Sequence, residues 1–393
     1  MSNNNKTPAI RFKGFTDTWE QRKLGDIASD MVAGGDIDKD LILAEGQYPV
    51  IANALTGDGI VGYYDKEYRV NAPAVTVTGR GDVGHAKARL VNFTPVVRLL
   101  SVKSEHDVFF LENVINTLKI VIESTGVPQL TVPQLAKYEV AFPRQLDEEE
   151  HIGAFFKQLD HLITLHQRKY DKLTKVKKAM LEKMFPENGS PYPEIRFKGF
   201  TDAWEQREFG DENDLITGYP FESDCFSETG INLIRGMNVK RGYIDLSNDI
   251  CVKWTSSKGL ESYLLKENDI IIQMDGALIG KSYGIIKKKH LPALLVQRVT
   301  RARINNEIAD SDFMYQTIQR DFLTYISMNK TETAVPHLSL NDIKNFGIMV
   351  PTLLEQKMIG SFFANLDRLI TLHQRKLEKL KNIKKACLEK MFV

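Results

Sequence analysis

The sequence predicts an α+β protein with two similar globular domains and two long antiparallel helices, related by internal pseudo-two-fold symmetry. Three observations predict it: a duplicated opening segment, a duplicated helical segment, and dissimilar β-rich sequence between them. The phrase IRFKGFTDTWEQR at 10–22 returns as IRFKGFTDAWEQR at 195–207. Residues 152–185 and 359–392 are identical at 24 of 34 positions. Repeats this far apart indicate two domain-sized copies rather than a solenoid.

The composition is that of an ordinary globular protein, with 393 residues of which 42% are hydrophobic and 26% charged. A net charge of +1 argues against a protein that coats nucleic acid by bulk electrostatics, although it allows a local basic surface. No apolar run approaches the roughly 18 residues of a membrane span, and the polar start MSNNNKTPAIRF does not predict a signal peptide. Three widely separated cysteines fit neither a disulfide framework nor a zinc site. We therefore expect a cytoplasmic protein.

The repeats divide the chain into five segments. We expect a first domain at 1–145 with its opening segment at 10–26, a helix at 146–186, a linker at 187–194, a second domain at 195–351 with its opening segment at 195–211, and a second helix at 352–393. Pro186 and the turn-forming residues after it predict the linker.

Each helical segment carries an apolar stripe at heptad spacing, which requires a partner helix, and the other copy is the obvious partner. At 1.5 Å per residue, 34 residues span about 51 Å, so the pair would act as a coiled-coil spacer. The expected seam residues are Leu159, Leu162, His166, Leu173, Leu366, Leu369, His373 and Leu380. Antiparallel pairing could bring His166 and His373 face to face and make the seam pH-sensitive. Alternatively, both histidines are merely tolerated in the stripe.

The two dissimilar segments contain similar elements in the same order. We expect strands at 72–79, 85–91 and 95–102 before a helix at 108–124, and strands at 269–274, 283–289 and 294–304 before a helix at 312–326. The basic residues that share one face of an expected strand are His85, Lys87 and Arg89 in the first segment, and Arg301 and Arg303 in the second. Such residues could contact nucleic acid, or they could form a solvated face.

Two glycine-containing loops, at 78–84 and 275–281, occupy equivalent places. They could approach a phosphate backbone closely, or they could be hairpin turns. The sequence contains no GxxxxGK[ST] phosphate loop, no HExxH and no GxSxG. It also lacks the Asp/Asn-Pro-Pro motif of an amino-methyltransferase. We therefore expect that the chain is not an enzyme on its own.

These features together resemble the specificity (S) subunit of Type I restriction–modification systems, over essentially the whole chain. The resemblance rests on the openings RFKGFTDTWEQRKLGD (11–26) and RFKGFTDAWEQREFGD (196–211), on the exits VAFPRQLDEEEHIGAFFKQLD (140–160) and IMVPTLLEQKMIGSFFANLD (348–367), and on their duplicated order. The second exit keeps the family's Glu-Gln pair at 355–356. The first has Glu149 and Glu150 in its place, with one extra residue before Ile152.

The resemblance implies two target-recognition domains that each read one half of a bipartite, asymmetric DNA site. The repeated segments would form the spacer and dock two modification (M) subunits, which methylate adenine N6 with S-adenosylmethionine. Restriction (R) subunits would add ATP- and Mg-dependent translocation and cleavage, while this chain itself would bind no cofactor and no metal. The expected DNA-binding residues are Arg80, His85, Lys87, Arg89 and Gln129 in the first domain, and Lys281, Lys287, Arg301, Arg303 and His337 in the second.

The openings supply candidate aromatic residues for docking the M subunits: Phe12, Phe15, Trp19, Phe197, Phe200 and Trp204. These residues could instead attach each opening segment to the core of its own domain. A rival hypothesis is a non-catalytic protein-binding scaffold, with two β-rich domains on a helical strut and no role in DNA binding. That scaffold would show no salt-dependent DNA binding.

Overall fold

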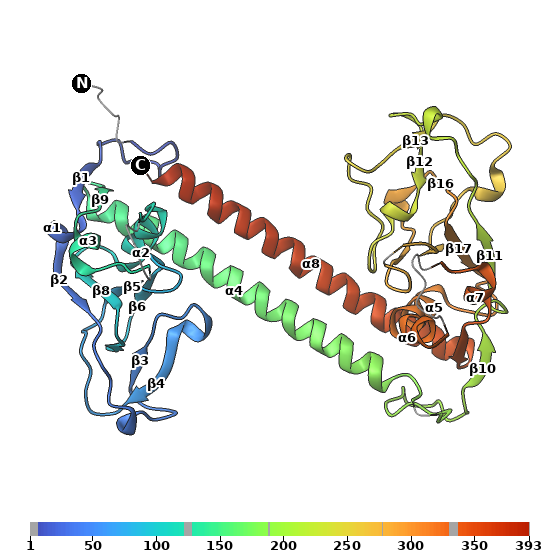
Figure 1. The fold of residues 1–393 in the computed structure, drawn as a ribbon, viewed down its shortest axis with the longest axis horizontal. Coiled ribbons are helices and arrows are strands. Elements are labelled where there is room, and N and C mark those ends of the chain that lie inside the picture. Colours follow the sequence, from blue (N-terminus) through green and yellow to red (C-terminus); the bar gives the residue numbers. More distant parts are fainter. Residues whose placement is uncertain (1–6, 122–127, 188, 277, 330–336, 393) are drawn as a thin grey trace. The chain divides into compact units, whose positions relative to one another are not determined.

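The structure, a computed structural model, describes residues 7–121, 128–187, 189–276, 278–329 and 337–392. The helix expected at 108–124 is too long, because the helix ends at Thr117. Its last three expected residues, one residue of the expected linker and one of the loop at 275–281 lie outside these ranges. The chain forms two compact units. Unit 1 comprises residues 1–169 and 373–393, and unit 2 comprises residues 170–372. Each unit therefore combines one domain with parts of both long helices (Figure 1).

Unit 1 contains a four-stranded antiparallel sheet and a smaller three-stranded lobe. The strands of the larger sheet are, in sheet order, β2 (Ala28–Ala33), β8 (Leu99–Ser104), β5 (Ala74–Thr78) and β6 (Ala86–Arg89). The smaller lobe contains β4 (Ile60–Tyr64), β3 (Tyr48–Ile51) and β7 (Thr94–Pro95), with β3 and β7 parallel. All five residues of β5 are buried, and β6 lies at the edge of its sheet.

Short elements attach the opening segment of unit 1 to its domain. They are β1 (Glu20–Lys23), which pairs with β9 (Glu139–Phe142), and the helices α1 (Leu24–Ile27), α2 (Val108–Thr117) and α3 (Val132–Ala136). The helix α2 begins at Val108 because the carboxylate of Asp107 accepts hydrogen bonds from two backbone N–H groups of the first turn, at 3.0 and 2.8 Å.

Unit 2 repeats this topology. Its larger sheet contains, in sheet order, β11 (Asn213–Thr217), β17 (Val299–Ile304), β14 (Ile270–Gln273) and β15 (Tyr283–Ile285). Its smaller lobe contains β13 (Lys253–Trp254), β12 (Ile231–Ile234) and β16 (Ala293–Leu295), and β10 (Glu205–Glu208) pairs with β18 (Gly347–Val350). Its helices are α5 (Ser311–Thr317), a π-helical turn (Ile318–Phe322), α6 (Leu323–Asn329) and α7 (Leu340–Lys344). The predicted α+β class with two repeated domains is confirmed.

The strand expected at 294–304 is wrong in one respect, because a turn divides it into β16 and β17. The strand expected at 95–102 is likewise divided, between β7 and β8. In both places the turn contains an arginine with positive φ, Arg98 or Arg298. Sequence patterns place such backbone at glycine or asparagine, so neither turn was predicted.

The two long helices are α4 (Leu146–Lys183), whose first turn contains three acidic residues, and α8 (Leu353–Met391), whose first turn contains Glu355; negative charge suits a helix N-terminus. In unit 1, Lys384 Nζ of α8 lies 2.6 and 2.8 Å from the carboxylate of Asp160 on α4. In unit 2, the lysine lies on α4 and the aspartate on α8: Lys177 Nζ lies 2.6 Å from the carboxylate of Asp367. The repeat therefore places the same ion pair in each unit.

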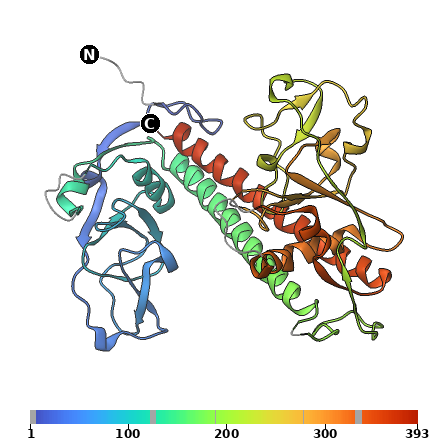
Figure 2. The same ribbon diagram turned by 45° about the vertical axis from the view of Figure 1, so that its right-hand side comes forward.

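A glycine in each long helix makes room for the helix that packs against it. A Cβ atom on Gly153 would lie 1.9 Å from the Asp107 carboxylate that caps α2, and one on Gly360 would lie 2.2 Å from the equivalent Asp310. Figure 2 shows α2 beside α4 in unit 1. The phrase Ile-Gly, common to both repeats, thus reflects a close approach between helices.

A buried ion pair joins each opening segment to its own domain's long helix. Arg11 donates from Nε and Nη2 to Glu148, at 2.5 and 2.7 Å. Arg196 makes the same two bonds to Glu355, both at 2.7 Å. Glu148 is therefore the counterpart of Glu355, and the match of Glu149 and Glu150 to the Glu-Gln pair at 355–356 is wrong by one residue. The extra residue lies before the helix and leaves its register unchanged.

The core of unit 1 is completed by the far end of the chain. Phe392 lies beside Trp19, Phe110 and Phe156, with ring centroids at 6.3, 5.5 and 5.7 Å. The backbone N–H of Ile10 donates to the carbonyl of Lys390 at 2.9 Å. The last turn of α8 is therefore part of the first domain's core.

Unit 2 builds the same cluster with the end of α4. Phe185 lies beside Trp204, Phe313 and Phe363, with ring centroids at 5.7, 5.4 and 6.1 Å. The backbone N–H of Ile195 donates to the carbonyl of Lys183 at 2.8 Å. Both units thus receive the end of the helix that belongs to the other repeat.

His166 and His373 face one another in unit 1, with their Nδ1 atoms 2.9 Å apart. Only one of the two Nδ1 atoms can donate in such a contact, so the pair requires at least one neutral ring. Burial, and then each ring's charged neighbours, lower the pKa of both histidines. Those neighbours are the partner ring for His166, and Lys169 and Lys376 for both. The facing pair that was one of two alternatives is therefore present.

Replacing both histidines with glutamine is expected to flatten the pH dependence of stability on the acid side. The unfolded chain, with an ordinary histidine pKa of about 6.5, binds more protons than the folded chain, so stability falls as the pH drops through that value. Urea unfolding of the full chain between about pH 7.5 and 5.5 measures the effect. His161→Gln, at an exposed position of α4, is the control. An identical acid slope in the double variant and the wild type would contradict the prediction.

Candidate nucleic-acid interface

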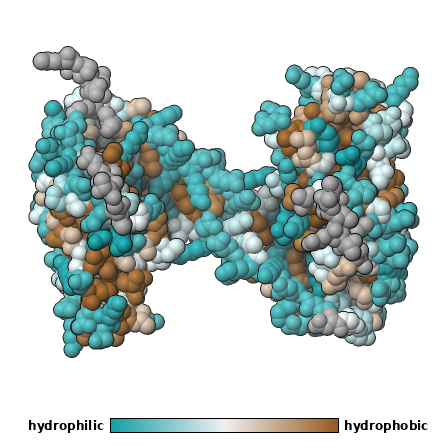
Figure 3. All heavy atoms as spheres, viewed as in Figure 1, coloured by the Kyte–Doolittle hydropathy of each residue, from teal (hydrophilic) through white to brown (hydrophobic). Residues whose placement is uncertain are grey.

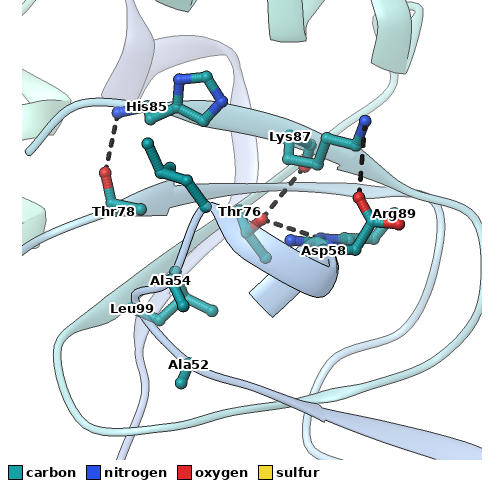
Figure 4. Close-up of a pocket in the computed structure, with 10 residues that line it drawn as sticks. Ala52, Ala54, Asp58, Thr76, Thr78, His85, Lys87, Arg89 and Leu99 are labelled. Carbon is teal, nitrogen blue, oxygen red and sulfur yellow. Dashed lines mark hydrogen bonds and ion pairs between the residues drawn. The ribbon is translucent and has the colours of Figure 1, made fainter. Parts of the chain in front are cut away.

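Three of the predicted DNA-binding residues of unit 1 line one cleft (Figure 4). His85, Lys87 and Arg89 come from β6 and the residue before it, at the edge of the larger sheet. The segment after β3, including Leu55 and Asp58, forms the other wall. The cleft therefore lies where the larger sheet meets the smaller lobe.

Polar contacts hold the cationic side chains in this cleft. Arg89 Nε donates to Thr76 Oγ1 at 3.0 Å, and Lys87 Nζ lies 4.0 Å from the carboxylate of Asp58 (Figure 4). Burial lowers the pKa of Arg89 and of His85, because desolvation disfavours the charged form. Arginine still keeps its charge near neutral pH, so Lys87 and Arg89 present two cations to a ligand in the cleft.

A second cleft adjoins the first at Lys87, which lines both. Its other wall is α4, which contributes Lys157, His161 and Arg168. Lys157 Nζ lies 4.6 Å from the ring centroid of Phe109 on α2. The same cleft also contains Glu112 and Asp160, so basic side chains continue from the edge of the sheet onto the long helix among two carboxylates.

Both glycine loops are hairpin connections, which was one of their two interpretations. In unit 1 the loop closes between β5 and β6, where the backbone N–H of Gly84 donates to the carbonyl of Thr78 at 2.8 Å. Arg80 is exposed in this loop and forms a β-bridge with Gln129. The equivalent bridge in unit 2 joins Asp275 and His337, whose side chains are also in contact.

The predicted residues of unit 2 do not form an equivalent cationic cleft. Arg301 is buried and paired with Asp214 on the neighbouring strand β11, and Arg303 pairs with Asp269 at 2.8 and 2.6 Å. The strand β17 that carries them is central in its sheet, and each arginine is paired with a carboxylate of the same unit, with side chains that are 3% exposed for Arg301 and 25% for Arg303. Both arginines therefore have a structural role in the fold.

The other two predicted basic residues of unit 2 lie at its surface. Lys281 is exposed in the hairpin loop. Lys287 follows β15, with its Nζ 3.8 Å from Asp312 and 3.5 Å from the side-chain oxygen of Asn268. With His337, these residues are the part of the predicted set that a ligand of unit 2 could reach.

Two arginines that the sequence analysis did not select stand in equivalent turns. Arg98 has a φ of 70° and Arg298 a φ of 68°. Positive φ in a residue other than glycine costs on the order of 1–3 kcal/mol and occurs often at functional sites. Arg298 is 73% exposed, and its Nε lies 3.3 Å from Asp275. No local sequence signal marks these positions, because their distinction is the backbone conformation.

The candidate docking aromatics divide into two groups. Trp19 and Trp204 are each only 3% exposed and belong to the aromatic clusters of their own domains, in accord with the alternative interpretation. The four phenylalanines are half-buried. The ring centroid of Phe12 lies 6.0 Å from that of Phe155 on α4, and the ring centroid of Phe197 lies 6.3 Å from that of Phe362 on α8. Phe15 and Phe200 complete this half-buried group. Only the phenylalanines therefore keep surface for a partner.

The expected seam residues are shared between the units. Leu159, Leu162 and Leu380 lie in unit 1 with the histidine pair, and Leu173, Leu366 and Leu369 lie in unit 2. Leu366 and Leu173 pack with the domain core of unit 2. Within the described ranges, no helix is long and apolar enough to cross a membrane. The same residues contain no cluster of three or more His, Cys, Asp or Glu side chains suited to a metal ion.

Comparison with known proteins assigns this duplicated architecture to a class that specifies DNA sites. The sequence model of the family described as Type I restriction modification DNA specificity domain matches residues 16–175 and 201–382. The chain belongs to this family. The resemblance to the specificity subunits of Type I restriction–modification systems is thereby confirmed.

Individual relatives are distant but extensive. The Type I restriction enzyme MjaVIII specificity subunit of Methanocaldococcus jannaschii is 24% identical over 392 residues, covering 94% of this chain and 91% of that protein. The Type I restriction enzyme EcoAI specificity subunit of Escherichia coli is 28% identical over 171 residues, covering 43% of this chain and 28% of that protein. The crystal structure of the Type I restriction–modification S subunit from M. genitalium shares the fold, with a TM-score of 0.71, 16% identity and coverage of 98% and 99%.

Proposed function

We propose that each domain of this specificity subunit reads one half of a bipartite, asymmetric DNA site. The long helices space the two domains and dock two adenine-N6 methyltransferase (M) subunits, and R subunits join the complex for restriction. The chain itself catalyses no reaction. S-adenosylmethionine is bound by the M subunits, and ATP with Mg by the R subunits.

One observation carries the proposal: the contacts that join each domain to the long helices are duplicated, whereas the candidate DNA-binding surfaces of the two domains differ. The buried Arg–Glu pair, the Lys–Asp pair and the aromatic cluster recur in both units with equivalent residues. The bridged loop positions, in contrast, hold Arg80 and Gln129 in unit 1 and Asp275 and His337 in unit 2. Two identical partners require the same surface twice, whereas two different half-sites require different side chains.

Adenine-methylation mapping tests the proposal in a host that expresses the chain with its cognate M subunit. The matched control is the same host with the M subunit alone. We expect a bipartite motif with one modified adenine in each half, present only with the chain. Exchange of residues 27–145 for those of another family member should then change one half of the motif and leave the other unchanged.

One outcome of this experiment would contradict the proposal. If the chain forms a stable complex with a competent M subunit and no motif appears, the specificity function is wrong. That result would favour the protein-binding scaffold. One surface suits such a role, because Leu43, Ile60 and Val61 are 42%, 37% and 50% exposed on the β3–β4 lobe. Figure 3 shows the hydrophobic area over this lobe of unit 1.

A further inference from the structure

We propose that Arg98 and Arg298 are phosphate-binding residues, held by their turns so that each domain grips the DNA backbone beside its half-site. This inference rests on the proposed DNA-reading function and adds residues that the sequence pattern did not indicate. Among the described residues, four non-glycine residues have a positive φ: Asp58, Arg98, Asn268 and Arg298. Aspartate and asparagine are enriched in this conformation, whereas arginine is not.

Glycine is the residue that this turn favours. The N–H of Leu99 donates to the carbonyl of Val96 at 3.0 Å, which puts Arg98 at the third position of a β-turn. A positive φ at that position selects glycine or asparagine. The chain does use glycine next to the turn: a Cβ on Gly34 would lie 2.0 Å from the carbonyl oxygen of Val96, and one on Gly79 would lie 2.2 Å from that of Arg98. Glycine is thus present at 34 and 79, where a Cβ atom would collide with the turn, whereas position 98, whose positive φ also favours glycine, holds arginine.

Neither arginine side chain makes contacts within its own domain that would offset the free-energy cost of its positive φ. In the part of the chain that the structure describes, no hydrogen bond or ion pair of the Arg98 guanidinium is found. Arg298 has one charged partner among the described residues, Asp275 at 3.3 Å, and its own side chain is 73% exposed. Exposed ion pairs of this kind contribute little to stability. Contacts within the fold therefore do not account for the two arginines, which points to a ligand outside it.

The turns lie beside the candidate DNA-binding residues. In unit 1, the side chain of Asn53 joins the turn to the hairpin loop, because it donates to the carbonyl of Val97 at 3.0 Å and accepts from the N–H of Gly79 at 2.8 Å. Leu99, directly after Arg98, lines the cleft that holds Lys87 and Arg89. In unit 2, the backbone N–H of Met274 donates to the carbonyl of Arg298 at 3.0 Å, just before the loop.

The identity of the residue indicates phosphate rather than a base. Positions that read different half-sites should differ between the domains, as the bridged loop residues do. A residue type shared by both domains suits the feature that both half-sites share, which is the phosphate backbone. In unit 2, a phosphate would replace the Asp275 carboxylate as the partner of Arg298. Arginine is well matched to phosphate because its fork of donors is planar and permanently charged.

Glycine substitution separates a binding role from a structural one, because the two roles predict different changes. Arg98→Gly and Arg298→Gly should keep or raise the thermal unfolding midpoint, since glycine adopts this φ freely. In the full complex with M subunits, each variant should reduce the slope of log affinity against log salt by about 1, and the double variant by about 2. Affinity for cognate and non-cognate duplexes should fall by the same factor. The methylated motif should stay the same.

Two controls complete the experiment. Arg144→Ala removes an exposed cation that lines neither cleft of unit 1, and should leave the salt slope unchanged. Arg98→Lys keeps the charge and should keep most of the slope. An unchanged slope in a folded double glycine variant would overturn the inference, and so would a changed motif or a lowered unfolding midpoint. If the wild-type complex itself shows no salt-dependent DNA binding, the proposed function fails instead.

Discussion

Arg196→Ala is expected to destabilise unit 2 by about 3–5 kcal/mol, because it leaves a buried carboxylate without its partner. Glu355 is 0% exposed and accepts two hydrogen bonds from Arg196, both at 2.7 Å. The side chain of Arg196 is itself only 14% exposed, so little water can replace the guanidinium. The penalty is therefore mainly that of an isolated buried charge, which exceeds the net value of the pair.

The repeat supplies the matched comparison. Arg11→Ala should have a similar effect in unit 1, where Glu148 is 1% exposed. Arg144→Ala removes a pair to Glu20 in which both side chains are 56% exposed, and should change stability by less than about 1 kcal/mol. Urea unfolding of the full chain, read by proteolysis of fragments from each unit, measures all three variants. A loss in Arg196→Ala no larger than that in Arg144→Ala would contradict the assignment.

The elements that local signals determine were predictable from sequence. The long helices begin near Leu146 and Leu353 because a proline precedes each, the first turn contains acidic residues in α4 and Glu355 in α8, and the apolar stripe continues without interruption. The strand β6 was predictable because its residues alternate between polar and apolar. Duplication made these predictions firmer, since the same signals occur twice.

Edge and central strands, in contrast, cannot be told apart by alternation. Both β6 and β17 carry basic residues on every second position, and both suggested a cationic surface. The edge strand keeps Lys87 exposed, while the central strand buries Arg301, which pairs with Asp214 on the neighbouring strand β11. The distinction depends on sheet order, which forms from contacts distant in sequence.

The turns at Arg98 and Arg298 were missed for a different reason. Sequence patterns assign positive φ to glycine and asparagine, and each arginine therefore read as part of a continuous strand. The partner of Trp19 was equally hidden, since Phe392 lies at the opposite end of the chain. Local sequence therefore could not indicate the positive φ of the two arginines, which opposes the preference of that residue type, or the contact between Trp19 and Phe392, which are far apart in the sequence.

Phe185→Ala is expected to destabilise unit 2 by about 3–5 kcal/mol, the range found for removal of a buried aromatic ring. Phe185 is 2% exposed and stacks on Phe313, with ring planes 16° apart and centroids 5.4 Å apart. The guanidinium of Arg320 lies 5.4 Å from the same ring. Alanine would leave a cavity next to Trp204, and the surrounding sheet and helices can close it only in part. The emission of that tryptophan reports the change during denaturant unfolding.

Phe392→Ala tests whether the same cluster supports unit 1, and here the expected loss is smaller because Phe392 is half-buried. Met328→Ala, at a side chain that is 79% exposed, should stay within about 0.5 kcal/mol and serves as the control. Phe185→Ala should lower chiefly the stability of unit 2, although Phe185 follows the helix of the first repeat. Phe392→Ala should lower chiefly the stability of unit 1, although Phe392 follows the helix of the second repeat. A loss confined to the other unit would contradict the exchange of helix ends. The core of the first domain therefore depends on a residue that follows the helix of the second repeat, because Phe392 contacts Trp19, Phe110 and Phe156.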